Sequence, residues 1–122
     1  MAKPKQDKRR EQRIEQEIVV DAYDAEERAM GWYAYLEDQV RFPFAGKCIA
    51  PRALSPLRKG QEIAVVDLAP AQECEHEMFV MITWEDRKLA VPVAQLEVIR
   101  ADKATRQAVE DWHYWVHQGY EF

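Results

Sequence analysis

Apolar side chains recur at helical spacing near the start of the chain. The pattern repeats every three or four residues, at Ala29, Tyr33, Leu36 and Val40. Asp24 with Glu27 three residues later forms a capping box, the usual start of a helix. Pro43 cannot continue a helix. We therefore predict a helix from about residue 25 to about residue 40.

The middle of the chain changes to short β-prone runs. Strands are predicted at residues 47–53, 61–68, 77–84, 88–91 and 96–99, with a tight turn at residues 85–87. A last helix is predicted from about residue 102 to about residue 117, capped by Asp102 and ended by Gly119. The predicted fold class is α+β: a small SH3-like β-barrel or strongly bent antiparallel sheet, flanked by an N-terminal and a C-terminal helix.

Charge divides the chain into two parts. Residues 1–13 hold six Lys or Arg and two Asp or Glu, a net charge of +4, whereas the rest has a net charge of −9. Residues 1–17 are interpreted as a basic arm, flexible or helical, and residues 18–122 as a single domain. An acidic body attracts cations and repels nucleic acid, so a nucleic-acid partner is not expected except through the arm.

Several classes of protein are disfavoured. The sequence has no apolar run of membrane-spanning length and no apolar signal region, so we expect a cytoplasmic protein without a membrane partner. Cys48 and Cys74 are too few for a disulfide framework and are expected to be reduced. No nucleophile elbow or glycine-rich phosphate loop is present, and an enzyme is not expected.

Two carboxylates lie where the first predicted helix ends. Glu37 and Asp38 occupy its last turn, the negative end of the helix macrodipole, which favours Lys, Arg or His. Something cationic must compensate them. The sequence offers Arg41 and Lys47, and a partner protein or a metal ion would serve equally.

A second acidic cluster is the segment ECEHEMF, residues 73–79. In an extended chain Glu73, Glu75 and Glu77 would share one face. Carboxylate oxygens suit calcium, although an EF-hand is excluded because its sixth position would be Met78 and its twelfth Trp84. The alternative is a solvated acidic loop beside Lys or Arg.

A third pattern concerns softer metals. His113 and His117 are spaced i and i+4 on the last predicted helix, a spacing that can bind zinc or copper. With Cys74 and His76 they could form a four-ligand site. The alternative is a pair of histidines at the edge of the core.

Three longer segments carry a family resemblance: DAYDAEERAMGWYAYLEDQVRFPFAGKC (residues 21–48), SPLRKGQEIAVVDLAPAQECEHEMFVMITWEDRKLAVPVAQLE (55–97) and EDWHYWVHQGYEF (110–122). Together they resemble the CcbP-type calcium-binding proteins known from cyanobacteria, where the family is connected to heterocyst differentiation. The resemblance implies Ca2+ binding without EF-hands, for buffering or sensing cytosolic calcium.

The expected calcium ligands are the acidic positions within the matching segments. Asp38 is the first candidate, followed by Glu37, Glu73, Glu75 and Glu77. The alternative function is an SH3-like module that binds an unidentified protein or a nucleic acid, with the basic arm as its contact element.

Overall fold

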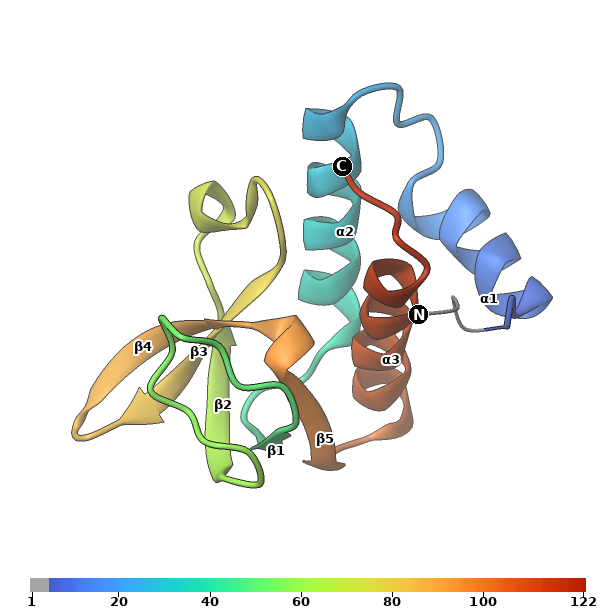
Figure 1. The fold of residues 1–122 in the computed structure, drawn as a ribbon. Helices are drawn as coiled ribbons and strands as arrows, with labels where there is room; N and C mark the ends of the chain where they lie inside the picture. The colour runs from blue at the N-terminus through green and yellow to red at the C-terminus, as the bar shows by residue number, and fades with distance from the viewer. Residues whose placement is uncertain (1–4) are drawn as a thin grey trace.

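The computed structural model describes residues 5–122. Within this part the chain forms three α-helices, five strands and three short helices of other types (Figure 1). In chain order they are α1 (Lys8–Arg13), the π-helix η1 (Ile14–Ile18), α2 (Ala25–Gln39), β1 (Phe44–Cys48), β2 (Glu62–Leu68), the 3-10 helix η2 (Ala71–Cys74), β3 (Phe79–Trp84), β4 (Arg87–Pro92), the 3-10 helix η3 (Val93–Gln95), β5 (Leu96–Arg100) and α3 (Lys103–His117). Helices therefore flank a sheet-forming middle, as predicted.

The five strands found in residues 5–122 make one antiparallel sheet in the order β4-β3-β2-β1-β5. Its register shifts between Ala45 and Gly46 and again between Val65 and Asp67, and such irregularities bend strands. β4 and β5 form the two edges of the sheet. The fold is thus the bent open sheet, the second form of the predicted α+β class, and not a closed barrel.

The first strand lies earlier in the chain than predicted. β1 covers Phe44–Cys48, whereas the sequence favoured residues 47–53. Pro51 has no N–H to donate to a ladder, and the chain bends away after Cys48. The backbone of Cys48 still pairs with its neighbour, since its N–H donates to the carbonyl oxygen of Gln61 at 2.9 Å.

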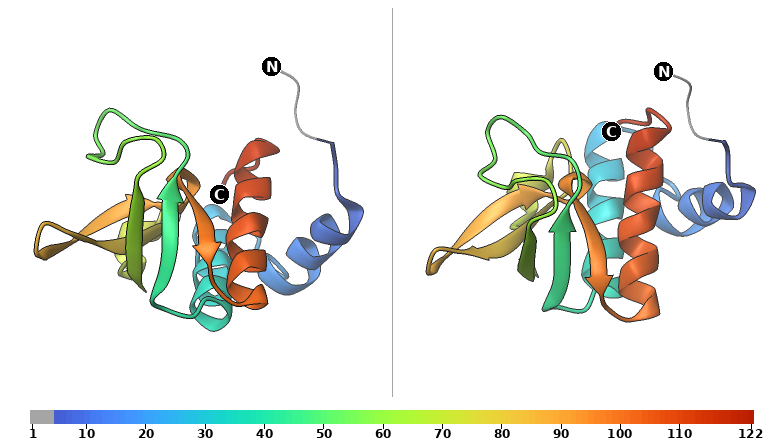
Figure 2. Two further views of the ribbon diagram at one scale, coloured as in Figure 1. Left: turned by 90° about the horizontal axis from the view of Figure 1, so that it is seen from below. Right: turned by 60° about the horizontal axis from the view of Figure 1, so that its bottom comes forward.

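The molecule has three layers. α2 and α3 lie next to each other and cover one face of the sheet, and the segment α1–η1 lies on the side of these helices away from the sheet (Figures 1 and 2). Among residues 5–122, no helix combines the length and the apolar character needed to cross a lipid bilayer.

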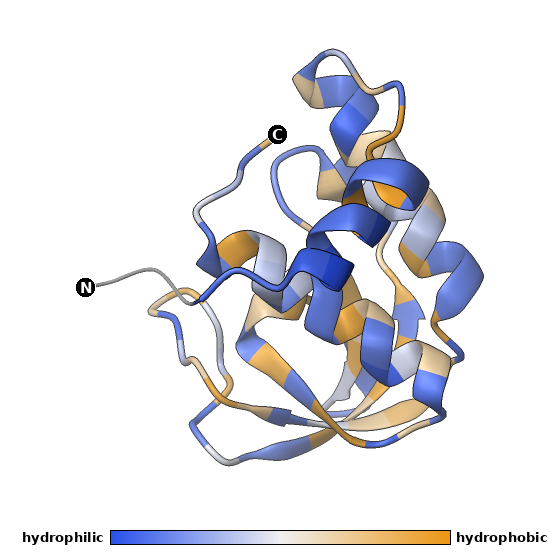
Figure 3. Ribbon diagram, turned by 90° about the vertical axis from the view of Figure 1, so that its right-hand side faces the viewer, coloured by the Kyte–Doolittle hydropathy of each residue, from blue (hydrophilic) through white to orange (hydrophobic). Residues whose placement is uncertain are grey.

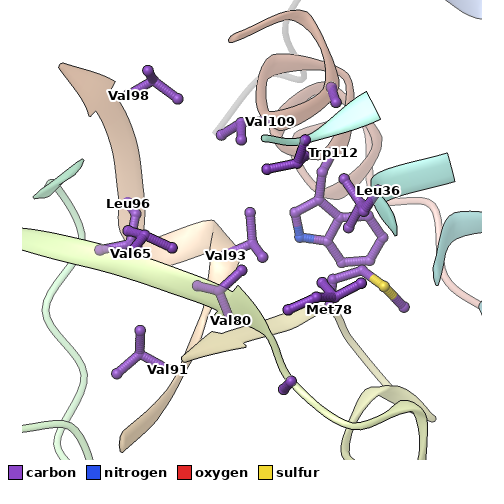
Figure 4. Packing of buried hydrophobic residues seen from close by; sticks show 14 of the residues in the cluster. Leu36, Val65, Met78, Val80, Val91, Val93, Leu96, Val98, Val109 and Trp112 are labelled. Atoms are coloured by element: carbon purple, nitrogen blue, oxygen red, sulfur yellow. The ribbon is translucent and has the colours of Figure 1, made fainter. Parts of the chain in front are cut away.

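The core lies between the sheet and the two long helices. Alternate strand residues such as Val65, Val80 and Leu96 point toward Leu36 of α2 and Trp112 of α3 (Figure 4). Behind them the fully buried Trp32 contacts three aromatic rings, with centroid distances of 5.0 Å to Trp112, 5.6 Å to Trp115 and 5.9 Å to Tyr35. Aromatic packing of this kind holds α2 firmly against α3.

Local signals place the ends of the elements. Asp24 accepts a hydrogen bond from the Glu27 N–H at 2.8 Å, and Asp102 accepts one from the Thr105 N–H at 2.8 Å, so both predicted caps are present. Gly119 follows α3 with φ of +82°, the left-handed conformation that ends many helices.

The N-terminal segment is a helix packed on the body. It is mostly hydrophilic (Figure 3), but Ile14 and Ile18 are buried. Its Arg13 reaches the fully buried Asp111 of α3 with N–O distances of 2.9 and 2.7 Å. Residues 1–4 of the predicted arm lie outside the described residues. From residue 8 onward the arm is helical and is held against α3 through part of its basic charge.

Candidate calcium site

The end of α2 presents its two carboxylates in different directions. The helix ends at Gln39, and Val40 is already extended, with φ of −88° and ψ of 128°. Consecutive helical residues are rotated by about 100°. Both side chains are exposed, but only Glu37 lines the two cavities on the side of η2. Asp38 accepts a hydrogen bond from the Gln39 side-chain amide at 2.8 Å.

Neither nearby cation of the sequence compensates these carboxylates. Arg41 pairs with Asp102 of α3 at 3.4 Å, and Lys47 pairs with Glu97 of β5 at 3.3 Å. The last turn of α2 contains no basic residue. Within the described chain, the ion pairs of Arg41 and Lys47 therefore leave the negative end of α2 available to an external cation.

Glu37 is brought together with a carboxylate that sequence reasoning missed. Both Glu37 and Asp67, near the end of β2, line a cavity of about 510 Å³ beside Tyr33. The Tyr33 hydroxyl donates to the Ala69 carbonyl oxygen at 2.7 Å, which ties α2 to the segment after β2. The pKa of Tyr33 is raised above its ordinary value of 10, first by burial and then by the negative charge of Cys74, Glu37 and Asp67.

Asp67 was missed because it is a single carboxylate at the end of an apolar strand and is not part of an acidic cluster in the sequence. The only feature of the sequence that could have indicated Asp67 is its position, directly after the apolar run of β2 and near the end of that strand. Its partner lies thirty positions earlier, and only the packing of α2 beside the end of β2 brings the two together.

The acidic segment 73–77 has a different shape from the one expected. The extended chain that would align three glutamates is replaced by η2 and a bend. Cys74 turns inward, where its Sγ accepts a hydrogen bond from the Phe79 N–H at 3.4 Å. Glu77 is held by the Arg52 guanidinium at 2.7 and 3.1 Å. Glu73 and Glu75 are exposed, and Glu75 and Glu77 share a groove with Glu37.

The four-ligand transition-metal site that the sequence allowed as one alternative is not formed by the described residues. Among residues 5–122, no three His, Cys, Asp or Glu side chains lie close enough to hold one ion. His113 is instead a histidine at the edge of the core, with its Nε2 at 2.5 Å from the Leu96 carbonyl oxygen. An ion at the carboxylates would accordingly take at most two side chains of these types and complete its shell with carbonyl oxygens and water.

The burial of His113 predicts a pH dependence of stability. Burial lowers the pKa of His113 below its ordinary value of 6.5, against a smaller opposing effect of the Leu96 carbonyl. The unfolded chain thus binds this proton more readily than the fold. The contribution is complete above about pH 6.5 and is lost as the pH falls below it. His113→Gln should flatten the change in urea midpoint between about pH 7.5 and about pH 5.

The matched control for this prediction is His117→Gln, which removes an exposed histidine from the same helix. This variant should show the same decrease in urea midpoint at acid pH as the parent chain. If the urea midpoint depends on pH in the same way in both variants, His113 is not the group that causes the loss of stability at acid pH.

Comparison with known proteins agrees with this architecture. A family model described as calcium binding, named for CcbP, matches residues 12–116. The chain belongs to the CcbP family of calcium-binding proteins. The crystal structure of Anabaena CcbP is 41% identical, with a TM-score of 0.88, and the match covers 100% of both chains. A calcium-binding protein in its calcium-binding form is 40% identical, with a TM-score of 0.87 and the same full coverage. No match is found among curated protein sequences.

The family covers the sheet, α2 and nearly all of α3, together with the end of α1 and all of η1. The matched range therefore includes the end of α2, where Glu37 and Asp38 lie. The resemblance found in the sequence and the fold class are both confirmed.

Proposed function

We propose that this chain binds Ca2+ reversibly at the C-terminal end of α2 and thereby buffers or senses cytosolic calcium. The observation that carries the proposal is the pair Glu37 and Asp38 at the negative end of a helix, while Arg41 and Lys47 pair elsewhere. An uncompensated site of this kind is unfavourable for the metal-free fold and attractive to a divalent cation.

The donor atoms fit calcium. Glu37 and Asp67 face a shared cavity, Asp38 lies on the next position of the helix, and the last carbonyl groups of α2 have no partner within the helix. All of these are hard oxygen donors, which calcium accepts in irregular arrangements of about six to eight. Glu73, Glu75 and Glu77 of the neighbouring connection are the further candidate ligands. Waters would complete the shell, so we expect modest affinity.

Calcium at this place would act on the fold as well. The ion would reduce the net charge of −9 carried by residues 14–122 and join the end of α2 to the segment after β2. Binding to the folded state alone stabilises it by about 2.7 kcal/mol at a hundredfold excess over Kd. A sensor would need a partner that distinguishes the two states; a buffer would not.

Calorimetry tests the proposal. Chelator-stripped protein titrated with CaCl2 should show saturable binding that persists in millimolar magnesium. Removal of a charged ligand should weaken binding by about tenfold or more. Asp38→Asn, Glu37→Gln and Asp67→Asn test the three carboxylates in turn, and we expect this loss in at most two of the variants. Asp38→Asn should also leave the metal-free fold equally or more stable, because it relieves repulsion at the helix end.

The control is Glu15→Gln, an exposed residue of η1 with the same change in charge. It should leave calcium affinity unchanged. Absence of calcium heat, or heat abolished by magnesium, would reduce the carboxylates to a solvated surface. Unchanged affinity in any one variant would remove that residue from the site.

A further inference from the structure

A long groove runs along the exposed side of α2. We call it the α2 groove; its walls are residues 25–37 of α2, residues 71–77 of the connection around η2, and residues 112–122 at the end of α3 and the tail. Figure 1 shows α2 with the connection on one side and the tail on the other. The groove is an open depression with a volume of about 1230 Å³, which is large enough for a peptide.

Small side chains create the hollow. Ala25 and Ala29 are four residues apart on α2, so they lie above one another on the face that meets the groove, and Ala34 and Ala71 also line it. Met30 adds a flexible apolar side chain that is 64% exposed. Methionine on an open surface adapts to different apolar partners. Ala29 itself is buried, whereas Ala25, Met30, Ala34 and Ala71 are exposed, so the groove offers apolar contact that the described chain leaves uncovered.

The rim of the groove is acidic. Nineteen described residues line it; none is Lys or Arg, and five are glutamates, namely Glu26, Glu37, Glu75, Glu77 and Glu121. Arg52 reaches Glu77 from outside the groove. Arg10 and Arg13 of the basic arm contact Asp111 and are not available to this rim. Arg28 donates to the carbonyl oxygen of Phe122 in the wall formed by the tail, which places one cation beside the groove. Five glutamates still line the groove, so its charge favours a cationic occupant.

We propose that the α2 groove binds a basic amphipathic helix of a partner protein. Apolar residues of the partner would contact the alanines and Met30, and its Lys or Arg residues would face the glutamates. Glu26 and Glu37 are eleven positions apart, which is about 16 Å along α2 and matches three turns of a bound helix. Laying an amphipathic helix in a groove is a common mode of peptide recognition.

The groove and the proposed calcium site share residues. Glu37, Glu75 and Glu77 line the groove and are candidate calcium ligands, so this step rests on the proposed function. A bound Ca2+ removes the negative charge that attracts the helix. Peptide affinity should therefore fall when calcium binds, and by linkage the peptide lowers calcium affinity by the same factor, about five- to tenfold.

The test uses a fluorescent peptide of about sixteen leucine and lysine residues, arranged as an amphipathic helix, and the chelator-stripped full chain. Anisotropy should rise saturably and the affinity should decrease with salt. A scrambled peptide of the same composition should bind at least tenfold more weakly. Equal binding of the scrambled peptide would overturn the proposal, because simple charge attraction would then suffice.

Variants locate the contact without touching the calcium ligands. Glu26→Gln with Glu121→Gln should lower peptide affinity about tenfold, and Met30→Lys should lower it further, while calcium affinity stays constant. Glu15→Gln with Glu62→Gln makes the same change in net charge on exposed positions outside the groove and should have little effect. Equal losses in both double variants would overturn the groove as the site.

Two further measurements separate the remaining outcomes. Sedimentation that shows a dimer dissolved by Met30→Lys would assign the groove to a second copy of the chain and overturn the proposal. Repeating the anisotropy measurement with saturating calcium tests only the coupling between calcium and peptide binding. If calorimetry shows calcium binding but the peptide affinity is unchanged, the proposed competition is overturned, while the groove still stands as the peptide site. If calorimetry shows no calcium binding, the proposed function is overturned. Peptide binding measured without calcium still tests whether the groove binds a basic helix.

Discussion

Replacing Asp111 with alanine should destabilise the fold by about 3 kcal/mol, the largest loss that we expect from a single polar substitution. The Asp111 carboxylate is fully buried on α3 and accepts hydrogen bonds from Arg13 at 2.9 and 2.7 Å and from the Tyr35 hydroxyl at 2.7 Å. Arg10 lies 3.2 Å from the same group. Three elements therefore converge on one buried charge.

The size of this effect follows from what the substitution leaves behind. Removing one partner of a buried ion pair costs about 3 to 5 kcal/mol, because the other charge stays desolvated. The Arg13 and Arg10 side chains are 22% and 23% exposed and can turn partly to water, which puts the cost near the lower limit. Tyr35, whose pKa burial and Asp111 raise to about 12, would lose its acceptor.

A double-mutant cycle in urea denaturation measures the pair. Arg13→Met should cost about 2 kcal/mol, and the double variant about 3 kcal/mol instead of the sum, since the two residues act as one unit. Glu110→Ala, the exposed neighbour on α3, should stay within about 0.5 kcal/mol of the parent. A loss below about 1 kcal/mol for Asp111→Ala would mean that the N-terminal segment is not held on α3 in solution.

Replacing Gly31 with alanine should destabilise the fold by about 2 kcal/mol, although the same change usually stabilises a helix. Gly31 lies inside α2, where alanine is favoured over glycine by about 1 kcal/mol. A Cβ at this position would lie 2.2 Å from the Ile18 carbonyl oxygen of η1. Because that atom belongs to the backbone, η1 would have to move away from α2.

The sign of the change in unfolding free energy shows whether the steric clash with η1 or the higher helix propensity of alanine is the larger effect. Urea denaturation and hydrogen exchange at Ile18 would report the displacement of η1. Ala34→Gly, at an exposed position of the same helix, measures helix propensity alone and should cost about 1 kcal/mol. If Gly31→Ala proved stabilising by about 1 kcal/mol, the close packing of η1 on α2 would be refuted.

These two contacts change the view of the basic arm. From its net charge of +4, the sequence predicted a flexible or helical arm, which in the alternative function would contact a protein or a nucleic acid. In the structure, Arg10 and Arg13 instead neutralise Asp111 inside the protein, while Ile14 and Ile18 extend the core. The charge asymmetry of the sequence is thus partly compensated within the fold.

Local chemistry determined much of the architecture. Asp24 and Asp102 predicted the starts of α2 and α3, and Gly119 the end of α3, because capping depends on a few neighbouring residues. The turn at Glu85 and Asp86, which have φ of +45° and +65°, obeys the same kind of rule. The resemblance of residues 21–48 and of the two later segments also identified the family correctly.

The arrangement of the acidic residues was decided by tertiary structure. Glu37 and Asp67 are 30 positions apart in the chain and line one cavity, and Arg13 is hydrogen-bonded to Asp111, 98 positions away. Both arrangements follow from the way the helices and the sheet pack. The same packing pairs Arg41 with Asp102 and Lys47 with Glu97. It also places residues 71–74 in the 3-10 helix η2 instead of an extended chain. Residue types in the sequence show which groups need a counter-charge; only long-range packing determines which partner each group receives.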